Sequence, residues 1–326
     1  MNSLIDTSSP SMLSRVADSL YWMARYLERA EQTTRLLDAN IQIMLELKAH
    51  AVEIQLDRMN RSLGGPVRRE GPFTVPQMEA ALIFDTATPN SIMSCVFQAR
   101  ENARQVREQI TSEMWSELNG LYHFVKQYDR EDLDQELPFD FLSEVRRKIS
   151  LFKGETGGTM SHGPEWWFLQ LGRHMERALL NATMLNAHRA ELSGEAEVGA
   201  LELLALLRSA NAFEAYLKRY TAEFNAESIV EFLLLNPAHP HSILFSVKRM
   251  EESISHLPEA GGRGRRTEVV RLVGRLGATL SFSSVDEIFA AGLDQALSNV
   301  IRQCLQLHAA IHEAYIDYPI EGSLPA

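Results

Sequence analysis

Two short segments of the sequence place arginine and glutamate one helical turn apart. Residues 25–30 read RYLERA and residues 173–178 read RHMERA, so Arg, Glu, Arg and Ala recur after 173 − 25 = 148 positions. In a helix, positions i, i+3 and i+4 share one face, so each segment would present two guanidinium groups and one carboxylate together. Guanidinium groups bind carboxylates and phosphates through paired hydrogen bonds, and a glutamate can act as a general acid or base. The six candidate side chains are Arg25, Glu28, Arg29, Arg173, Glu176 and Arg177.

The first segment faces away from the main apolar stripe of its helix. With Leu27 at position a of a heptad, the three charged residues fall at positions f, b and c. Trp22 lies on the same face, one turn before Arg25. The segments could form an Arg–Glu–Arg ion network that docks helices, a cationic surface that binds a carboxylate or phosphate, or a solvated face. We favour the ion network, because buried arginine and glutamate need each other as partners.

No other motif in the sequence names a reaction. His308 and His312 are one turn apart, as metal-binding histidines often are, but the glutamate beside the first histidine of a zinc peptidase is missing. A solvated helix end is therefore expected there. Cys95 and Cys304 lie among apolar residues, which predicts buried and unreactive thiols. The sequence names no catalytic residue, and we expect neither a metal site nor a cofactor.

Helices must position the candidate side chains. Apolar residues recur at alternating intervals of three and four from Leu13 to Met44, which predicts one long helix over about residues 11–60. Ser284 to Glu287 have the pattern of a capping box for a last helix that reaches about Tyr315. No alternating pattern indicates a strand. Glycine and proline are expected to interrupt the helices at Gly71-Pro72, Pro89, Pro138, Gly154–Gly163, Gly194, Pro237–Pro240 and Gly261–Gly264.

A second pair of segments repeats at nearly the same separation as the charged pair. Residues 85–92 and 236–243 share Ala, Pro, Ser and Ile at an offset of 236 − 85 = 151. The sequence therefore predicts an all-α protein, an elongated helical bundle with two tandem, related halves. We expect one integrated domain with halves at residues 11–155 and 156–320, a disordered tail at residues 1–10 and a further tail at residues 321–326.

Composition narrows the classes of partner. The 326 residues carry 32 Lys and Arg against 43 Asp and Glu, a net charge of −11. An acidic chain is a poor candidate for binding nucleic acid or an anionic membrane. Two cysteines argue against a disulfide scaffold, and neither a signal peptide nor an apolar stretch of membrane-spanning length is evident. We expect a cytoplasmic protein, and the sequence leaves homo-oligomerisation open.

At its charged segments the chain resembles the alpha-E family, a bacterial family of predicted all-helical domains with a Glu-Arg motif. The resemblance covers about residues 11–318, and its most specific part is the first Glu-Arg block. The second half departs from the family pattern at residues 160–163, which read MSHG where an arginine or similar polar residue is typical. Any role of Arg15 is therefore expected to be missing from that half. The matching segments are residues 12–15, 21–31, 99–104 and 171–178.

The resemblance implies a role in amide-bond chemistry. Genes of this family typically neighbour a circularly permuted ATP-grasp protein and a transglutaminase-like cysteine peptidase. We therefore expect an accessory or scaffold subunit that works with an ATP-grasp-type ligase and a transglutaminase-like protein to modify peptides or small molecules. The alternative is an enzyme whose two motifs form an anion-binding active site, with Glu28 or Glu176 as acid or base and the arginines holding an acidic group.

Overall fold

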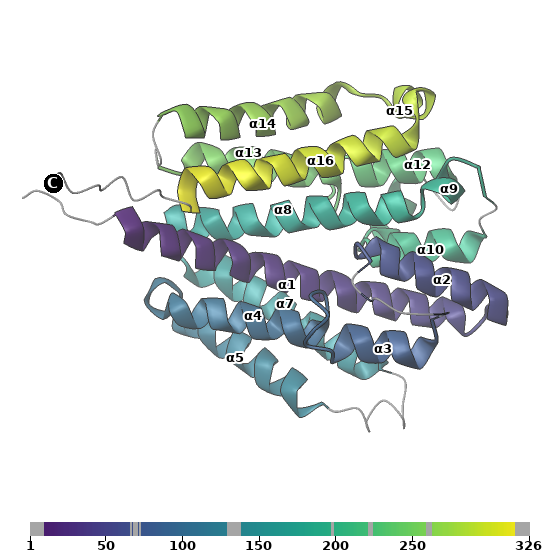
Figure 1. The fold of residues 1–326 in the computed structure, drawn as a ribbon, viewed down its shortest axis with the longest axis horizontal. Helices are drawn as coiled ribbons and strands as arrows, with labels where there is room; N and C mark the ends of the chain where they lie inside the picture. The colour runs from purple at the N-terminus through teal and green to yellow at the C-terminus, as the bar shows by residue number, and fades with distance from the viewer. Residues whose placement is uncertain are drawn as a thin grey trace, which may run out of the picture.

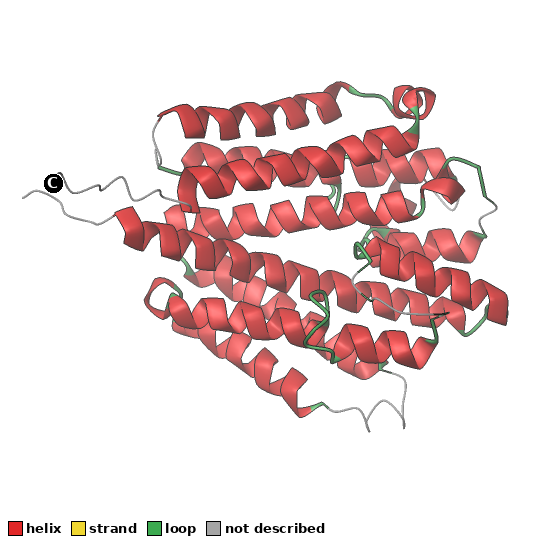
Figure 2. Cartoon of the chain, in the orientation of Figure 1, coloured by secondary structure: helices red, strands yellow, loops and turns green. Residues whose placement is uncertain are grey.

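The computed structural model describes residues 10–65, 67, 71, 73–128, 138–196, 199–220, 224–258 and 263–316. Within them every regular element is a helix, as the sequence predicts (Figure 2). The two expected tails lie outside the described residues, except for Pro10, which begins the first helix. The elements are α1 (Pro10–Met44), α2 (Ala49–Ser62), α3 (Val75–Ile83), α4 (Ile92–Gln105), the short η1 (Arg107–Gln109), α5 (Ser112–Gln127), α7 (Phe139–Thr159), α8 (Pro164–Ala187), α9 (Arg189–Leu192), α10 (Ala200–Ser209), α11 (Phe213–Tyr220), α12 (Ala226–Val230), η2 (Glu231–Leu235), α13 (Ile243–His256), α14 (Arg263–Phe282), α15 (Val285–Ala291), α16 (Leu293–Ile311) and η3 (His312–Ile316).

Two long helices, α1 and α8, lie side by side through the middle of the molecule (Figure 1). They run parallel, because the backbone of Tyr21 meets Gly172 at one end of the contact and Gln32 meets Met184 at the other. Gly172 permits this close approach, since a Cβ atom there would lie 2.2 Å from the carbonyl oxygen of Tyr21. The pairing brings the two charged segments face to face.

The other helices flank this central pair. On one side α1 packs against α4 and α7, and α5 packs against both of these. On the other side α8 packs against α13 and α16, and α14 packs against both of those (Figure 1). Buried apolar residues from both sides belong to one continuous core, which includes Leu27 of α1 and Met175 of α8. The core therefore extends across the central pair.

The expected helix over residues 11–60 is wrong in its length. The first helix ends at Met44, and α2 begins at Ala49 and folds back against α8. Between them the chain turns tightly, because the amides of Glu46 and Leu47 donate to carbonyl groups three residues earlier. Leu45 is 65% exposed there, so its apolar side chain does not continue the buried stripe. No glycine or proline marks this turn, which is why the pattern of the sequence missed it.

The expected breaks at Gly71, Pro89, Pro138, Gly194 and Pro237–Pro240 fall between helices, but two glycine-rich segments behave differently. Helix α7 continues through the three glycines of residues 154–158 and ends at Thr159. The expected loop at residues 261–264 is also shorter, since α14 begins at Arg263. The capping box at Ser284 is confirmed, but the last helix breaks at Gly292, whose φ of +99° lies in the region that favours glycine. No helix among the described residues is long and apolar enough to span a bilayer.

Candidate functional site

The two charged segments meet at the contact between α1 and α8, and each glutamate binds arginine from the other helix. Glu176 of α8 accepts hydrogen bonds from Nε of Arg25 and Nε of Arg29, both at 2.6 Å. Glu28 of α1 accepts from Arg177, with Nε at 2.5 Å and Nη2 at 3.0 Å. The motifs therefore do not form two separate sites. Their ion pairs fall into two neighbouring clusters, one at Glu176 and one at Glu28, which we call together the ion network and which join two helices about 150 residues apart in sequence.

The surroundings of Glu176 are aromatic. The guanidinium of Arg25 lies 4.4 Å from the ring centroid of Trp22, a cation–π contact, and its Nη1 lies 3.1 Å from Nδ1 of His308. The same His308 nitrogen lies 2.9 Å from the hydroxyl of Tyr21. Glu176 itself is 1% exposed. This half of the network is enclosed by rings, and its charges are satisfied within the protein.

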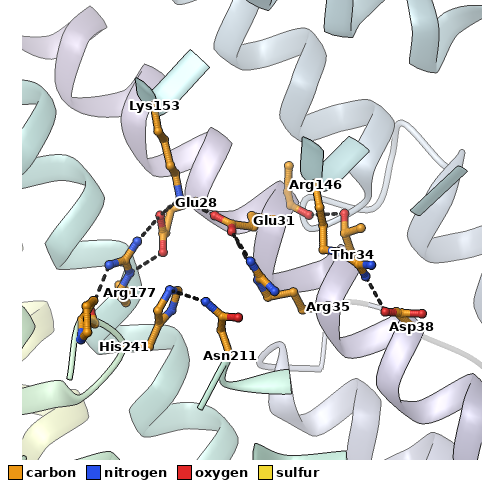
Figure 3. Close-up of polar contacts among 12 residues, drawn as sticks. Glu28, Glu31, Thr34, Arg35, Asp38, Arg146, Lys153, Arg177, Asn211 and His241 are labelled. Atoms are coloured by element: carbon orange, nitrogen blue, oxygen red, sulfur yellow. Dashed lines mark hydrogen bonds and ion pairs between the residues drawn. The ribbon is translucent and has the colours of Figure 1, made fainter. Parts of the chain in front are cut away.

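The surroundings of Glu28 are polar. Lys153 of α7 lies 2.8 Å from Glu28 and also binds Glu31, which in turn accepts from Arg35 at 2.8 Å (Figure 3). Arg177 donates its remaining Nη1 to the carbonyl oxygen of Pro240 at 2.9 Å. A chain of alternating charges thus leads from Arg177 along α1 to Arg35. This half of the network continues toward the surface.

Ion pairing outweighs burial for the carboxylates. Burial alone would raise the pKa of Glu28, but Arg177 and Lys153 hold it well below its ordinary value. The pKa of Glu31 falls to about 2, because Lys153 and Arg35 oppose the effect of burial and of the Glu28 charge. The pKa of Glu176 is also lowered against burial, by Arg25 and Arg29. All three glutamates are ionised at neutral pH and accept hydrogen bonds, so none is poised as a proton donor.

The two remaining candidates differ from the others. Arg173 occupies the same motif position as Arg25, but it hydrogen-bonds Gln170 at 3.2 Å and no glutamate pairs with it among the described contacts. Burial and then the neighbouring Arg177 charge lower its pKa, despite Glu28. Arg15 is exposed and stands ten residues before Arg25, or about 15 Å along the helix. The structure does not bring Arg15 to the network.

Several participants were not identified from the sequence. Lys153 lies 20 residues before Arg173, Glu31 directly follows the first charged segment, and His308 was expected at a solvated helix end. That expectation is wrong, because His308 is half-buried between Tyr21, Trp22 and Arg25. Burial and the Arg25 charge lower the pKa of His308 to about 3, so it is neutral. Of these residues, only Glu31 could have been found from the sequence, because it lies one turn after Glu28 on the same helix face.

The two cysteine thiols are unreactive. Cys95 and Cys304 are fully buried free thiols, as predicted, and burial raises the pKa of each to about 12. Neither is a thiolate at neutral pH, and the thiolate is the nucleophilic form. Among the described residues, no three His, Cys, Asp or Glu side chains are grouped so that they could hold a metal ion.

Both glutamates of the network are followed directly by an arginine, at residues 28–29 and 176–177. A family model described as a predicted alpha-helical domain with a conserved ER motif matches residues 12–316. The chain belongs to the Alpha-E family. The resemblance seen in the sequence is therefore confirmed over nearly the whole chain.

Three relatives are similar along most of this chain. They are uncharacterized proteins, Mb2597 of Mycobacterium bovis and MT2643 and Rv2567 of two Mycobacterium tuberculosis strains, each 23% identical over 333 residues. The match covers 94% of this chain but 36% of each relative, so the chain spans about a third of their length. No solved structure matches the chain.

Proposed function

We propose that this Alpha-E protein is an accessory or scaffold subunit of an amide-bond-forming system. Its partners would be an ATP-grasp-type ligase and a transglutaminase-like peptidase, acting on peptides or small molecules. The observation that carries the proposal is the crossed pairing of the motifs, in which Glu28 binds Arg177 while Glu176 binds Arg25 and Arg29. Charges that satisfy each other inside the protein hold helices in place and leave little capacity for substrate.

The chemistry around the network supports a role without catalysis. The three glutamates have lowered pKa values and guanidinium or ammonium partners, so they are poor proton donors at neutral pH. Cys95 is close enough for the charges of Arg29 and Glu176 to affect its pKa, but burial dominates and keeps it a neutral thiol. The chain would then contribute surfaces and rigidity, and its partners would contribute the reaction.

The length of the relatives is also consistent with a module that works beside another protein. Nearly two thirds of each mycobacterial relative lies outside the match. A helical module of this size can be joined to a second unit in one chain or bind it as a separate subunit. We place this protein in the cytoplasm with its partners.

We infer that the domain consists of two tandem, related halves, at residues 11–155 and 156–320. Thr33 donates from Oγ1 to the carbonyl oxygen of Asn90 at 2.9 Å, and Asn181 donates from Nδ2 to that of His241 at 2.6 Å. The donors are 148 residues apart and the acceptors 151, the same offsets as in the sequence repeat. One residue after each acceptor, a serine caps a 14-residue helix, α4 or α13. Equivalent contacts at equivalent offsets are what a duplicated half would leave.

One integrated domain is expected, since α1 and α8 share a buried ion network and a continuous core. Limited proteolysis should produce cuts without releasing stable fragments near residue 155. Two fragments that separate on gel filtration and each keep a cooperative unfolding transition would contradict this view.

Complex formation tests the accessory role. The purified chain would be mixed with an ATP-grasp protein of the kind that typically neighbours genes of this family, and the mixture analysed by size-exclusion chromatography with light scattering and by an ATP-hydrolysis assay. We expect a stable complex and a change in ATP turnover of at least several-fold. Neither a complex nor an effect on turnover, with either neighbour protein, would sink the proposal.

The enzyme alternative is tested by the arginines at matching motif positions. Arg25→Ala and Arg173→Ala would be compared by thermal unfolding and in the turnover assay. Loss of structure in the first variant fits an ion network. A folded Arg25→Ala protein that has lost activity would instead favour an anion-binding active site at the motifs.

A further inference from the structure

A polar groove lies beside the network, outside the two motifs. It encloses about 310 Å³ between the second half of α1, α7 and the junction of α10 and α11. Three arginines from three different helices line it: Arg35 of α1, Arg146 of α7 and Arg208 of α10. Its volume is at the lower end of the range for small-molecule sites.

Arginines outnumber carboxylates in the lining of the groove although the chain is acidic. Three arginines and two carboxylates, Asp38 and Glu214, line it, whereas the whole chain has a net charge of −11. A third carboxylate, Glu31, pairs with Arg35 from outside the lining. The pairs leave donors unused. Arg35 directs Nε and Nη2 to Glu31, and Arg146 directs Nη1 to Asp38 (Figure 3). A guanidinium has five N–H donors, so each retains hydrogen-bonding capacity toward a ligand.

Arg208 is the least committed of the three arginines. Its side chain is exposed, and its partners are the amide oxygen of Gln42, at 2.9 Å, and the ring of Phe213, whose centroid lies 5.4 Å away. Neither partner neutralises its charge. A guanidinium held in place without a carboxylate is well suited to bind an incoming anion.

Asn211 connects the groove to the network. It lies just after α10 with a φ of +52°, a left-handed conformation that often ends helices and that glycine adopts with less strain than other residues. Its side-chain amide lies 3.2 Å from Nε2 of His241 (Figure 3). His241 is a buried histidine whose Nδ1 has no partner among the described residues. Asn211 therefore places a hydrogen-bonding side chain between the groove and His241, whose pKa is lowered by burial and by the nearby charge of Arg177.

We propose that this groove binds a small ligand through an oxyanion group, a carboxylate or a phosphate, held by Arg35, Arg146 and Arg208. None of these three arginines belongs to the motifs, whose own arginines Arg25, Arg29 and Arg177 are already paired with glutamates. Arg35 is also the last member of the chain of charges that runs from the motifs, through Glu31, which it shares with Lys153. An anion bound at Arg35 competes with Glu31 for the guanidinium. The proposal does not depend on the suggested protein partners.

Isothermal titration of the full chain tests the site directly. Citrate would probe for a carboxylate ligand and inorganic phosphate for a phosphate ligand, both at constant ionic strength. We expect saturable binding of one of them with a dissociation constant of roughly 1 mM or below. Arg208→Gln should weaken binding about ten-fold or more, because it removes an exposed charge that does not support the fold.

Two further variants separate a site from a general charge effect. Arg147→Gln is the matched control, because Arg147 neighbours Arg146 on α7, pairs with Glu144 and does not line the groove. It should bind as the unaltered chain does. Arg146→Gln should weaken binding as Arg208→Gln does, with circular dichroism confirming its fold. The proposal is overturned if neither anion binds saturably at concentrations up to roughly 10 mM. It is also overturned if Arg147→Gln weakens binding as much as Arg208→Gln does.

Discussion

The Glu28 and Glu176 ends of the network have the same motif but different neighbours. Glu176 binds two arginines of one helix, and rings of Tyr21, Trp22 and His308 enclose that end. Glu28 binds an arginine and a lysine from different helices, and its end continues through Glu31 toward a polar groove. The Glu176 end is enclosed within the protein, whereas the Glu28 end is connected through ion pairs to groups near the surface.

The difference shows that a motif does not determine its own role. The Arg-x-x-Glu-Arg spacing puts the charges on one helix face in both places. What lies across from that face decides whether the charges are sealed by aromatic rings or linked to further charges. We therefore expect the Glu176 end to matter mainly for stability and the Glu28 end to be sensitive also to what binds nearby.

The largest expected effect is the loss of Glu176. Glu176→Ala leaves Arg25 and Arg29 buried without a carboxylate, which should lower the free energy of unfolding by about 4 kcal/mol. Glu28→Ala should cost less, about 2 kcal/mol, because only one buried arginine loses its carboxylate, Arg177 keeps its hydrogen bond to the Pro240 carbonyl, and Lys153 keeps Glu31. Urea unfolding measures both changes. Glu144→Ala, which breaks a partly exposed ion pair with Arg147, is the control and should change the free energy of unfolding by less than about 1 kcal/mol. The reverse order would break the comparison.

Protonation of Glu31 at low pH should destabilise the Glu28 end of the network. The folded-state pKa of about 2 lies below the ordinary value, so this carboxylate stabilises the fold above about pH 4.5, and the contribution is lost as the pH falls toward 2. Glu31→Gln should therefore be less stable than the unaltered chain by up to about 3 kcal/mol at pH 7 and equally stable near pH 2. Urea unfolding at several pH values measures the difference. A difference independent of pH would contradict the assignment.

The two equivalent arginines should respond unequally. Arg25→Gln removes a partner of Glu176 and a cation–π contact, and we expect it to cost about 2 kcal/mol of unfolding free energy. Arg173→Gln should change stability by less than about 1 kcal/mol, because burial and the Arg177 charge already disfavour a cation there. Thermal and urea unfolding of the pair measures this. Equal losses would mean that the two ends are more alike than their contacts indicate.

A small effect is also expected at Lys153. Lys153→Met should destabilise by about 1 kcal/mol, since Arg177 and Arg35 continue to hold the two glutamates that it bridges. Its effect should be non-additive with Glu28→Ala and additive with Glu176→Ala in a double-mutant cycle. Coupling to Glu176 as strong as to Glu28 would show that the ends act as one unit.

Much of the architecture could be predicted from local patterns. The all-helical class and the capping box at Ser284 follow from side-chain spacing, which local geometry controls. The turn after Met44 could not be predicted, because α2 folds back to pack against α8 and no local residue marks the break. Continuation of α7 through its glycines is also a tertiary effect, since packing outweighs a propensity cost of about 1 kcal/mol per residue.

The candidate site divides in the same way. The sequence by itself determined that two Arg-Glu-Arg triplets occur and that each lies on one helix face, because helical periodicity is a local property. Only the tertiary structure decided that Glu176 binds both arginines of the other triplet and Glu28 binds one, that Arg173 and Arg15 stand apart, and that Lys153 and His308 take part. Those choices depend on how closely α1 and α8 approach at Gly172 and on which distant helices cover them, and spacing within one helix carries no information about either.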